Sequence, residues 1–359
     1  MNRVFLIYLS GLLLLVSCNN KKNANDFAFL TPSEIFSKQN KLIGEVLDNA
    51  YYGKVESVWR ATDHGILVVQ QLDREVIQLL SYDNGLPMVR TGGLGRGPDE
   101  FIFPFIQSYD NISSTLYIEN LVLRTIYAYS ISENSIIKQN NFKMDYSKNS
   151  ENELNVLNGF GQVTDSTFIF LNRTPSEAKI IDLKGNLYFS MPIKTIDREE
   201  MDYSSNKYFQ MNLLISPDRS TVGIIDTDLH HIAVYKLENN RLIPHSKRQW
   251  LEWDISYTNG WYVANKDHYY FTSPRRMTDI YIYSVVQDRT MKNAWNEKRF
   301  QVQRDTYLLV FDFDCNLVAQ YYMDIPFHTY VVTNDNKYLY ALNHHEMEII
   351  RYELPKIKK

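Results

Sequence analysis

Cysteine is almost absent from this chain: the 359 residues include only Cys18 and Cys315. If Cys18 is modified near the N-terminus, as argued below, Cys315 is left alone and no intrachain disulfide can form. Cys315 lies in the sequence FDFDCNLVAQ, where we expect a hairpin turn at a position more often occupied by glycine or asparagine. No neighbouring motif supplies the base that a catalytic thiol needs. We therefore interpret Cys315 as a structural residue.

A surplus of positive charge is also missing. The chain has 38 Lys and Arg residues against 42 Asp and Glu, which gives a formal net charge of −4 and a pI near 6.1. Nucleic-acid-binding domains usually carry a strong basic footprint, so we expect no nucleic acid partner. Beyond residue 26, no apolar stretch approaches the ~20 residues that a membrane-spanning helix requires.

The N-terminus carries the one long apolar run. Arg3 precedes an uncharged apolar segment over residues 4–16, and Ser17 and Cys18 follow it. This order of a basic residue, an apolar run and small residues is typical of a secretory signal, and the run is too short for a retained membrane anchor. The tetrapeptide LVSC, which ends at Cys18, resembles the lipobox of bacterial lipoproteins.

A lipidated Cys18 would hold the mature protein on a membrane, because each buried methylene contributes ~0.8 kcal/mol. We expect a signal peptide over residues 1–17, a lipidated tether over 18–38 and a folded domain over 39–359. The residues after Cys18 are polar and lack an acidic run of the kind we associate with surface export. We therefore expect an outer membrane lipoprotein that faces the periplasm, with surface exposure as the alternative.

Long helical periodicity is missing from the rest of the chain, whereas aromatic residues are plentiful. Short aromatic and β-branched runs separated by polar clusters predict an all-β protein. One phrase recurs six times: an Asp or Asn turn, a short strand, a polar loop and a second strand. A period of roughly 40 to 50 residues built from short strands is typical of β-propeller blades. The predicted turn acids are Asp63, Asp110, Asp165, Asp218, Asp267 and Asp335.

Two irregularities locate the insertion and the ring closure. The interval from Asp267 to Asp335 is the longest, and we interpret residues 285–305 as an insertion in the fifth blade. Pro355 prevents a regular strand at the C-terminus, so the last blade lacks its outer strand. The unpaired segment Lys41–Leu47 is expected to supply that strand. The sequence thus predicts an all-β six-bladed β-propeller whose ring is closed by an N-terminal strand in the last blade.

A glycine-rich phrase follows the first repeat: GLGRGPDEF, residues 93–101. It lacks the spacing of a nucleotide-binding loop, so we interpret it as a tight connection between blades, with positive φ at several glycines, that could line the central opening. This phrase, the lipobox and the six repeats resemble the TolB-like or NHL-like six-bladed propeller lipoproteins. The resemblance implies fold and location but not chemistry, because propellers support many functions.

The loops between the second and third strands of the blades should open onto one face of the ring. These loops and the glycine phrase offer Arg or His side chains, interspersed with acids, which suits hydrogen-bonding recognition of a sugar or a peptide. Neighbouring histidines could bind a metal, but the sequence shows no convergent ligand set, and we expect no metal and no cofactor. The candidate ligand-binding residues are Arg74, Arg96, Arg124, Arg173, His230, His231, Arg275, Arg276, His344 and His345.

Two classes of function remain open. The first is a non-catalytic binding or scaffold module for a glycan, peptide or protein partner, which the absence of a catalytic motif favours. The second is a periplasmic hydrolase or lyase acting on glycans or peptides, with acid pairs such as Asp312 and Asp314, or the histidines, as its catalytic groups. In either case we expect a monomer.

Overall fold

The computed structural model describes most of the chain, but not its N-terminus. The described residues are 29–50, 58–70, 74–97, 100–120, 122–123, 125–145, 157–172, 177–193, 211–226, 230–251, 255–258, 261–264, 270–272, 275–290, 292–293, 304–327, 329–343 and 346–357. The predicted signal peptide and Cys18 lie outside these residues. No helix in the described part of the chain is long and apolar enough to cross a membrane.

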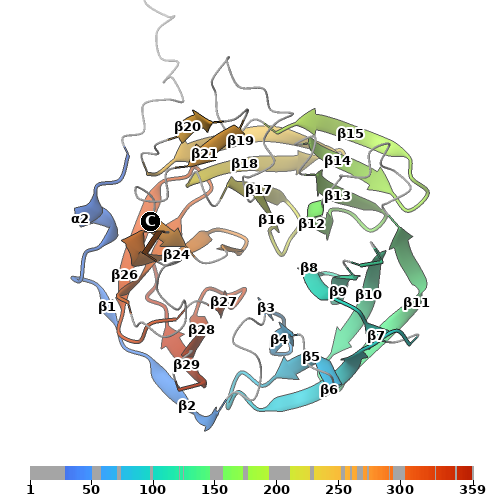
Figure 1. Cartoon of the computed structure of the whole chain (residues 1–359), viewed down its shortest axis with the longest axis horizontal. Coiled ribbons are helices and arrows are strands. Elements are labelled where there is room, and N and C mark those ends of the chain that lie inside the picture. The colour runs from blue at the N-terminus through green and yellow to red at the C-terminus, as the bar shows by residue number, and fades with distance from the viewer. Residues whose placement is uncertain are drawn as a thin grey trace, which may run out of the picture.

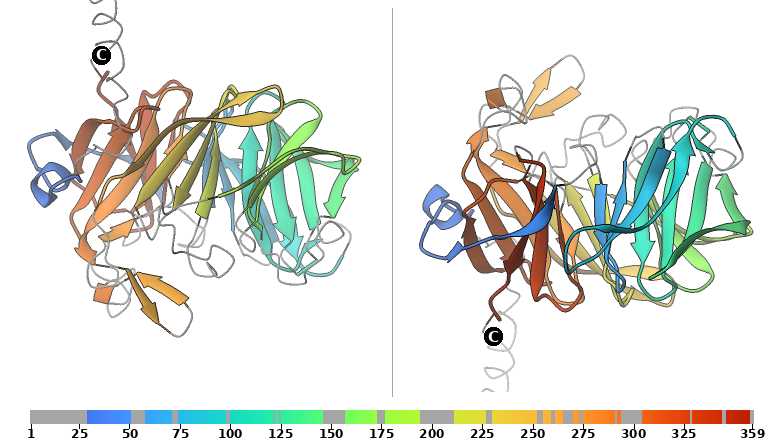
Figure 2. Two further views of the ribbon diagram at one scale, coloured as in Figure 1. Left: turned by 90° about the horizontal axis from the view of Figure 1, so that it is seen from above. Right: turned by 90° about the horizontal axis from the view of Figure 1, so that it is seen from below.

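Six mainly antiparallel sheets stand around a central channel, as Figure 1 shows from the end and Figure 2 from two sides. This arrangement confirms the predicted all-β six-bladed propeller. The innermost strands of neighbouring blades contact one another around the channel. In blade 1 these are, from the channel outwards, β3 (Val58–Ala61), β4 (Ile66–Val69), β5 (Arg74–Leu80) and β6 (Pro87–Leu94), with β7 (Glu100–Phe101) beside β6.

The next three blades are regular four-stranded sheets. Blade 2 consists of β8 (Pro104–Asp110), β9 (Thr115–Asn120), β10 (Thr125–Ser132) and β11 (Ser135–Asp145). Blade 3 consists of β12 (Leu157–Gln162), β13 (Thr167–Asn172), β14 (Glu177–Asp182) and β15 (Leu187–Pro192). Blade 4 consists of β16 (Met211–Ile215), β17 (Thr221–Asp226), β18 (His231–Glu238) and β19 (Arg241–Gln249).

Blade 5 departs from the predicted register. Its second strand, β24 (Ile282–Thr290), pairs with both β22 (Tyr270–Thr272) and β23 (Arg276–Met277), and β25 (Thr306–Phe311) and β26 (Leu317–Met323) follow outwards. The turn between first and second strands therefore carries Asp279. The predicted acid, Asp267, was wrong for that turn and lies outside the described residues.

The predicted insertion over residues 285–305 was wrong at its start. Residues 285–290 continue strand β24: Val285 and Val286 are buried on opposite faces of the blade, and Gln287 and Arg289 are buried as well, so the strand shows no alternation. Most of residues 291–305 lies outside the described part. A separate hairpin, β20 (Ile255–Thr258) and β21 (Trp261–Ala264), projects from the ring in Figure 2.

An N-terminal strand closes the ring, as predicted. Blade 6 consists of β27 (Tyr330–Val332), β28 (Tyr338–Asn343), β29 (Glu348–Glu353) and, on its outer edge, β2 (Glu45–Ala50), which runs antiparallel to β29. The short strand β1 (Lys41–Leu42) instead pairs in parallel with β26 of blade 5. The N-terminal segment therefore joins two blades, and Gly44 lies where it crosses between them.

The packed structure begins earlier than the predicted domain boundary. Leu30 and Ile35, which fall within the expected tether over residues 18–38, are buried in one apolar cluster with Trp250. Ile35 ends the one-turn helix α2 (Pro32–Ile35), whose start is fixed by a capping box between Thr31 and Glu34. Residues 29–36 thus cover the outside of the ring near blades 4 and 5.

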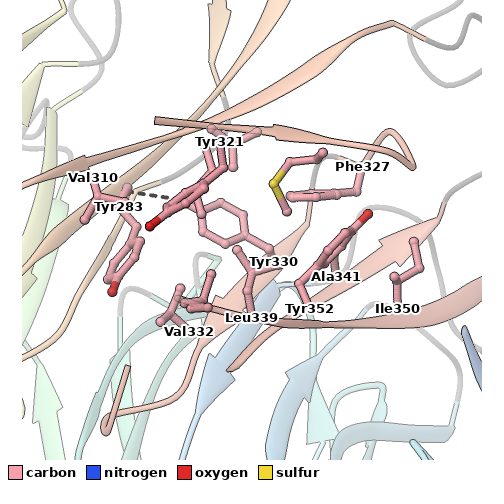
Figure 3. Packing of buried hydrophobic residues seen from close by; sticks show 14 residues of the cluster. Tyr283, Val310, Tyr321, Phe327, Tyr330, Val332, Leu339, Ala341, Ile350 and Tyr352 are labelled. Atoms are coloured by element: carbon pink, nitrogen blue, oxygen red, sulfur yellow. Dashed lines mark hydrogen bonds between the residues drawn. The ribbon is translucent and has the colours of Figure 1, made fainter. Parts of the chain in front are cut away.

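Apolar clusters fill the spaces between neighbouring blades. Figure 3 shows the cluster between blades 5 and 6, which is rich in tyrosine. The buried Tyr330 hydroxyl donates to the Tyr283 carbonyl oxygen at 3.0 Å, and the Tyr352 hydroxyl donates to the Ile325 carbonyl oxygen at 3.2 Å. Tyrosine suits these spaces because its ring fills the gap while its hydroxyl reaches a backbone acceptor. This packing gives four of the tyrosines, Tyr283, Tyr321, Tyr330 and Tyr352, a structural role.

The glycine-rich phrase forms the connection from blade 1 to blade 2, as predicted. The Glu100 carboxylate accepts a hydrogen bond from the Gly97 amide at 2.7 Å, and a Cβ atom at Gly95 would lie 2.0 Å from that carboxylate. Phe101 is buried between the two blades. The expected positive φ at several glycines was wrong: among the described glycines of residues 92–97 only Gly92 has one, at 78°. The phrase also lies outside the wall of the channel cavity described below.

Cys315 lies in the turn between β25 and β26, as predicted, with a positive φ of 62°. Its side chain is buried, and its Sγ lies 3.1 Å from the Ser246 hydroxyl. Burial raises the pKa of the Cys315 thiol to about 11, which keeps it protonated at neutral pH. These features fit the structural role inferred from the sequence.

Candidate binding site at the channel mouth

The turn between first and second strands closes each blade on the same side of the ring, which we call the turn face. Local side-chain bonds shape these turns. The Thr62 hydroxyl accepts from the amides of His64 and Gly65, and the Thr333 hydroxyl accepts from the Tyr338 amide. Short hydroxyl side chains favour such turns because they bond to nearby backbone groups. The repeated Ser/Thr and Asp pattern therefore specifies the turns.

Arg219 joins the turns of three blades. It lies in the turn of blade 4 with a positive φ of 60° and donates through Nε and Nη2 to both carboxylate oxygens of Asp110 in blade 2, each at 2.7 Å. Its Nη1 donates to Asp165 of blade 3 at 2.8 Å. The Arg219 and Asp110 side chains are only 7% and 4% exposed. This buried, bidentate ion pair fixes one half of the channel mouth.

Hydrogen bonds from amide groups join the remaining turns. Asn334 of blade 6 donates to Asn111 of blade 2 at 2.8 Å and to Asp63 of blade 1 at 3.3 Å. The Asp218 amide donates to the Asp279 carboxylate at 2.9 Å, which links blades 4 and 5. The turn face is therefore a connected polar surface, and such preorganisation lowers the entropic cost of binding a ligand.

A cavity of about 90 Å³ lies in the channel beneath the turn face. Arg60, Arg275 and Arg276 line one side of it, from blades 1 and 5. Gln107, Ser108 and Gln162 of blades 2 and 3 contribute amide and hydroxyl groups, and apolar side chains such as Leu213 and Val332 fill the wall between. The one acid among the lining residues is Asp110, whose charge is balanced by Arg219.

A larger groove, of about 460 Å³, lies beside this cavity between blades 6 and 1. It contains the rings of Tyr82 and Tyr340, whose centroids are 5.0 Å apart, and the ring of Tyr338. Asp63, Asp83 and Asp335 supply exposed carboxylates, and Arg351 is paired with Glu45. Asn334 lines both the groove and the cavity, so the two lie side by side.

The loops predicted to bind ligand lie on the opposite face of the ring. Arg74, at the start of β5, and Arg96, after β6, are exposed there. Arg124, Arg173, His344 and His345 lie outside the described residues.

Four predicted site residues lie elsewhere than expected. His230 is wholly buried, its ring centroid 4.8 Å from that of Trp250, and burial together with Arg275 lowers its pKa to about 3. His231 is also buried, at the start of β18. Arg275 and Arg276 were wrongly assigned to a loop between second and third strands, because β23 is the first strand of its blade. Both line the channel cavity instead.

The acid pair considered for catalysis has ordinary structural contacts. Asp312 accepts from the Asn316 amide at 2.8 Å within a turn, and Asp314 lies 3.0 Å from the His245 ring nitrogen. Within the described residues, no three His, Cys, Asp or Glu side chains gather as a metal site would require.

The comparisons agree with this architecture. A family described as TolB-like 6-blade propeller-like matches residues 36–335, and the chain belongs to this family. No curated protein matches the sequence. Among solved structures, a member of the DUF4221 family from Bacteroides vulgatus is similar, with a TM-score of 0.57, 12% identity, and 89% of this chain and 97% of that chain covered.

A second similar structure is that of a protein from Bacteroides fragilis, which is provisionally described as exported. Its TM-score is 0.54 and its identity 12%, with 89% of this chain and 95% of that chain covered. At this level of identity both likenesses concern the fold alone.

Proposed function

We propose that the chain is a lipid-anchored periplasmic module that binds a glycan on its turn face without transforming it. The six-bladed propeller fold is consistent with a binding or scaffold module. The lipobox-like tetrapeptide ending at Cys18 supports the anchor, and a propeller fold by itself assigns no reaction.

The groove between blades 6 and 1 carries the proposal. The partly exposed rings of Tyr82 and Tyr338, packed on the buried Tyr340, offer apolar surface to the C–H face of a sugar, and the exposed carboxylates accept hydrogen bonds from sugar hydroxyls. Concave sites with apolar walls and a few convergent polar groups are typical of ligand binding. Since Asp63 and Asp83 are exposed, they are accessible to a ligand.

Changing both Asp63 and Asp83 to Asn tests the groove. The double variant Asp63→Asn/Asp83→Asn should bind an oligosaccharide found in a glycan screen at least about tenfold more weakly, a loss of about 1.4 kcal/mol, because charged acceptors are replaced by neutral ones. Isothermal titration calorimetry measures the affinity, and chromatography of the recovered glycan tests for product.

The matched control is Glu133→Gln, which removes an exposed acid from the turn between β10 and β11, the two outer strands of blade 2. It should leave the affinity unchanged. If the groove variant and the wild type bind with equal affinity, the glycan does not bind in the groove. If product forms, the protein is a hydrolase or lyase. Binding of peptides alone would contradict the glycan assignment.

A further inference from the structure

Two arginines occupy equivalent places on the channel wall. Arg60 and Arg276 each stand two positions before the threonine of their blade's first turn, Thr62 and Thr278. Their strands, β3 of blade 1 and β23 of blade 5, both contact β27 of blade 6. The two side chains therefore border the same cavity from either side of β27.

Within the described ranges, neither guanidinium has a carboxylate partner. Arg60 donates to the Trp59 carbonyl oxygen at 3.0 Å. Arg276 donates through Nε to the Tyr330 carbonyl oxygen at 2.9 Å, and its guanidinium lies 5.3 Å from the centre of the Tyr330 ring. These contacts orient the two head groups but do not neutralise them.

The site also carries an electrostatic cost. Burial, and secondly the charge of Arg276, lower the pKa of Arg60, and burial lowers the pKa of Arg276. Arg60 nevertheless stays protonated at neutral pH, because its lowered pKa is about 9, and Arg276 keeps its charge because a guanidinium is not deprotonated in proteins. Two like charges in one partly enclosed cavity destabilise the protein, and such local cost is common at functional sites.

We propose that Arg60 and Arg276 form a subsite for a carboxylate of the bound glycan. This inference rests on the proposed function and adds that the glycan contains an acidic sugar. Guanidinium groups match the two oxygens of a carboxylate, and a cavity of about 90 Å³ far exceeds the ~10–15 Å³ needed by one water. The wall beside the arginines includes Leu213, Ile215 and Val332, which suits a singly charged group on a carbon skeleton better than a phosphate dianion.

Thermal denaturation with small probes tests the subsite. Sodium glucuronate should raise the melting temperature of the full-length protein, because a ligand that binds only the folded state stabilises it. Glucose, inorganic phosphate and sodium chloride at matched ionic strength should not, and N-acetylalanine, which has the carboxylate but lacks the sugar, should raise it less than glucuronate does. The rise should be lost in Arg60→Met/Arg276→Met and kept in Arg74→Met, which removes an exposed arginine from the opposite face.

Three results would overturn the subsite. They are no rise in the wild type with glucuronate, an equal rise in the double arginine variant, and an equal or larger rise with phosphate or N-acetylalanine. The Asp63→Asn/Asp83→Asn variant should keep the glucuronate effect. The experiments can therefore disprove glycan binding in the groove and carboxylate binding in the channel subsite independently of each other.

Stability of the variant separates a binding role from a structural one. Because the substitution removes an uncompensated pair of like charges, Arg60→Met/Arg276→Met should melt no more than about 4 °C below wild type. If it does not fold, Arg60→Lys/Arg276→Lys keeps both charges but loses the bidentate geometry, and its glucuronate effect should be smaller than that of the wild type. An undiminished effect in the lysine variant would contradict the proposed geometry.

Discussion

A chain that begins at residue 51 is expected to aggregate, whereas one that begins at residue 29 should fold. Removal of β2 leaves the outer edge of β29 unpaired and takes away the buried Leu47, and exposed strand edges promote association between molecules. Each fully buried aliphatic side chain contributes about 1.5–3 kcal/mol. Small domains have only about 5–15 kcal/mol of stability in total, so losses of this kind are decisive.

A chain that begins at residue 39 should give an intermediate result. It keeps β1 and β2 but loses Leu30 and Ile35, which are 7% and 0% exposed, so it should fold with a lower melting temperature. Circular dichroism and size-exclusion chromatography compare the three chains. Equal melting temperatures for the chains beginning at residues 39 and 51 would contradict the closure of the ring by β2.

A point variant tests the same closure without truncation. A Cβ atom at Gly44 would lie 2.4 Å from Ile350 Cγ2 and 2.9 Å from the Tyr352 ring, so Gly44→Val should displace the N-terminal segment from blade 6. The matched control is Ile43→Val, because Ile43 is 67% exposed and its neighbours need not move.

Arg219→Met should lower the free energy of unfolding by about 3–5 kcal/mol, because it leaves the Asp110 carboxylate buried without its partner. Asp165, the other partner of Arg219, is 94% exposed, and Asp165→Ala should change the stability by less than about 1 kcal/mol. The double variant Asp110→Leu/Arg219→Met should be more stable than Arg219→Met, since it removes both buried charges. Urea denaturation measures all three, and a loss below about 1 kcal/mol in Arg219→Met would contradict the role of the pair.

The effect of Arg219→Met should also depend on pH. Burial alone raises the pKa of Asp110, but hydrogen bonds from Arg219 and Ser113 outweigh burial and bring that pKa below its ordinary value. The stability gained from this lower pKa is therefore present above the ordinary carboxyl pKa of about 3.9, and is lost as the pH falls through the folded-state pKa. The difference between wild type and Arg219→Met should narrow below about pH 4.

The repeat pattern predicted the fold because each blade repeats the same local chemistry. Five of the six predicted turn acids, such as Asp63 and Asp335, occupy equivalent turns, and the unpaired N-terminal strand closes the ring. The prediction for blade 5 was wrong because the inner edge of this blade is divided between β22 and β23. The apolar run over residues 269–272 therefore resembled a second strand in the sequence.

The candidate site was harder to predict, because its contacts cross between blades. Arg219 and Asp110 are 109 positions apart, and Asn334 and Asn111 are 223 apart. Nothing in the local sequence distinguishes Arg219, which bridges blades, from the exposed Arg74. Likewise, the polar character of His230 pointed to a surface loop, whereas its ring packs on Trp250. The sequence nevertheless contained a signal for the channel site, since Arg60 and Arg276 both stand two positions before the threonine of a turn.

A crystal structure of the protein with the acidic oligosaccharide that it binds most tightly would locate the ligand directly. We expect a sugar carboxylate between Arg60 and Arg276, with the neighbouring sugars extending past Asn334 into the groove beside Tyr338. A ligand bound only on the opposite face, near Arg74, would show that neither the channel subsite nor the groove is the binding site.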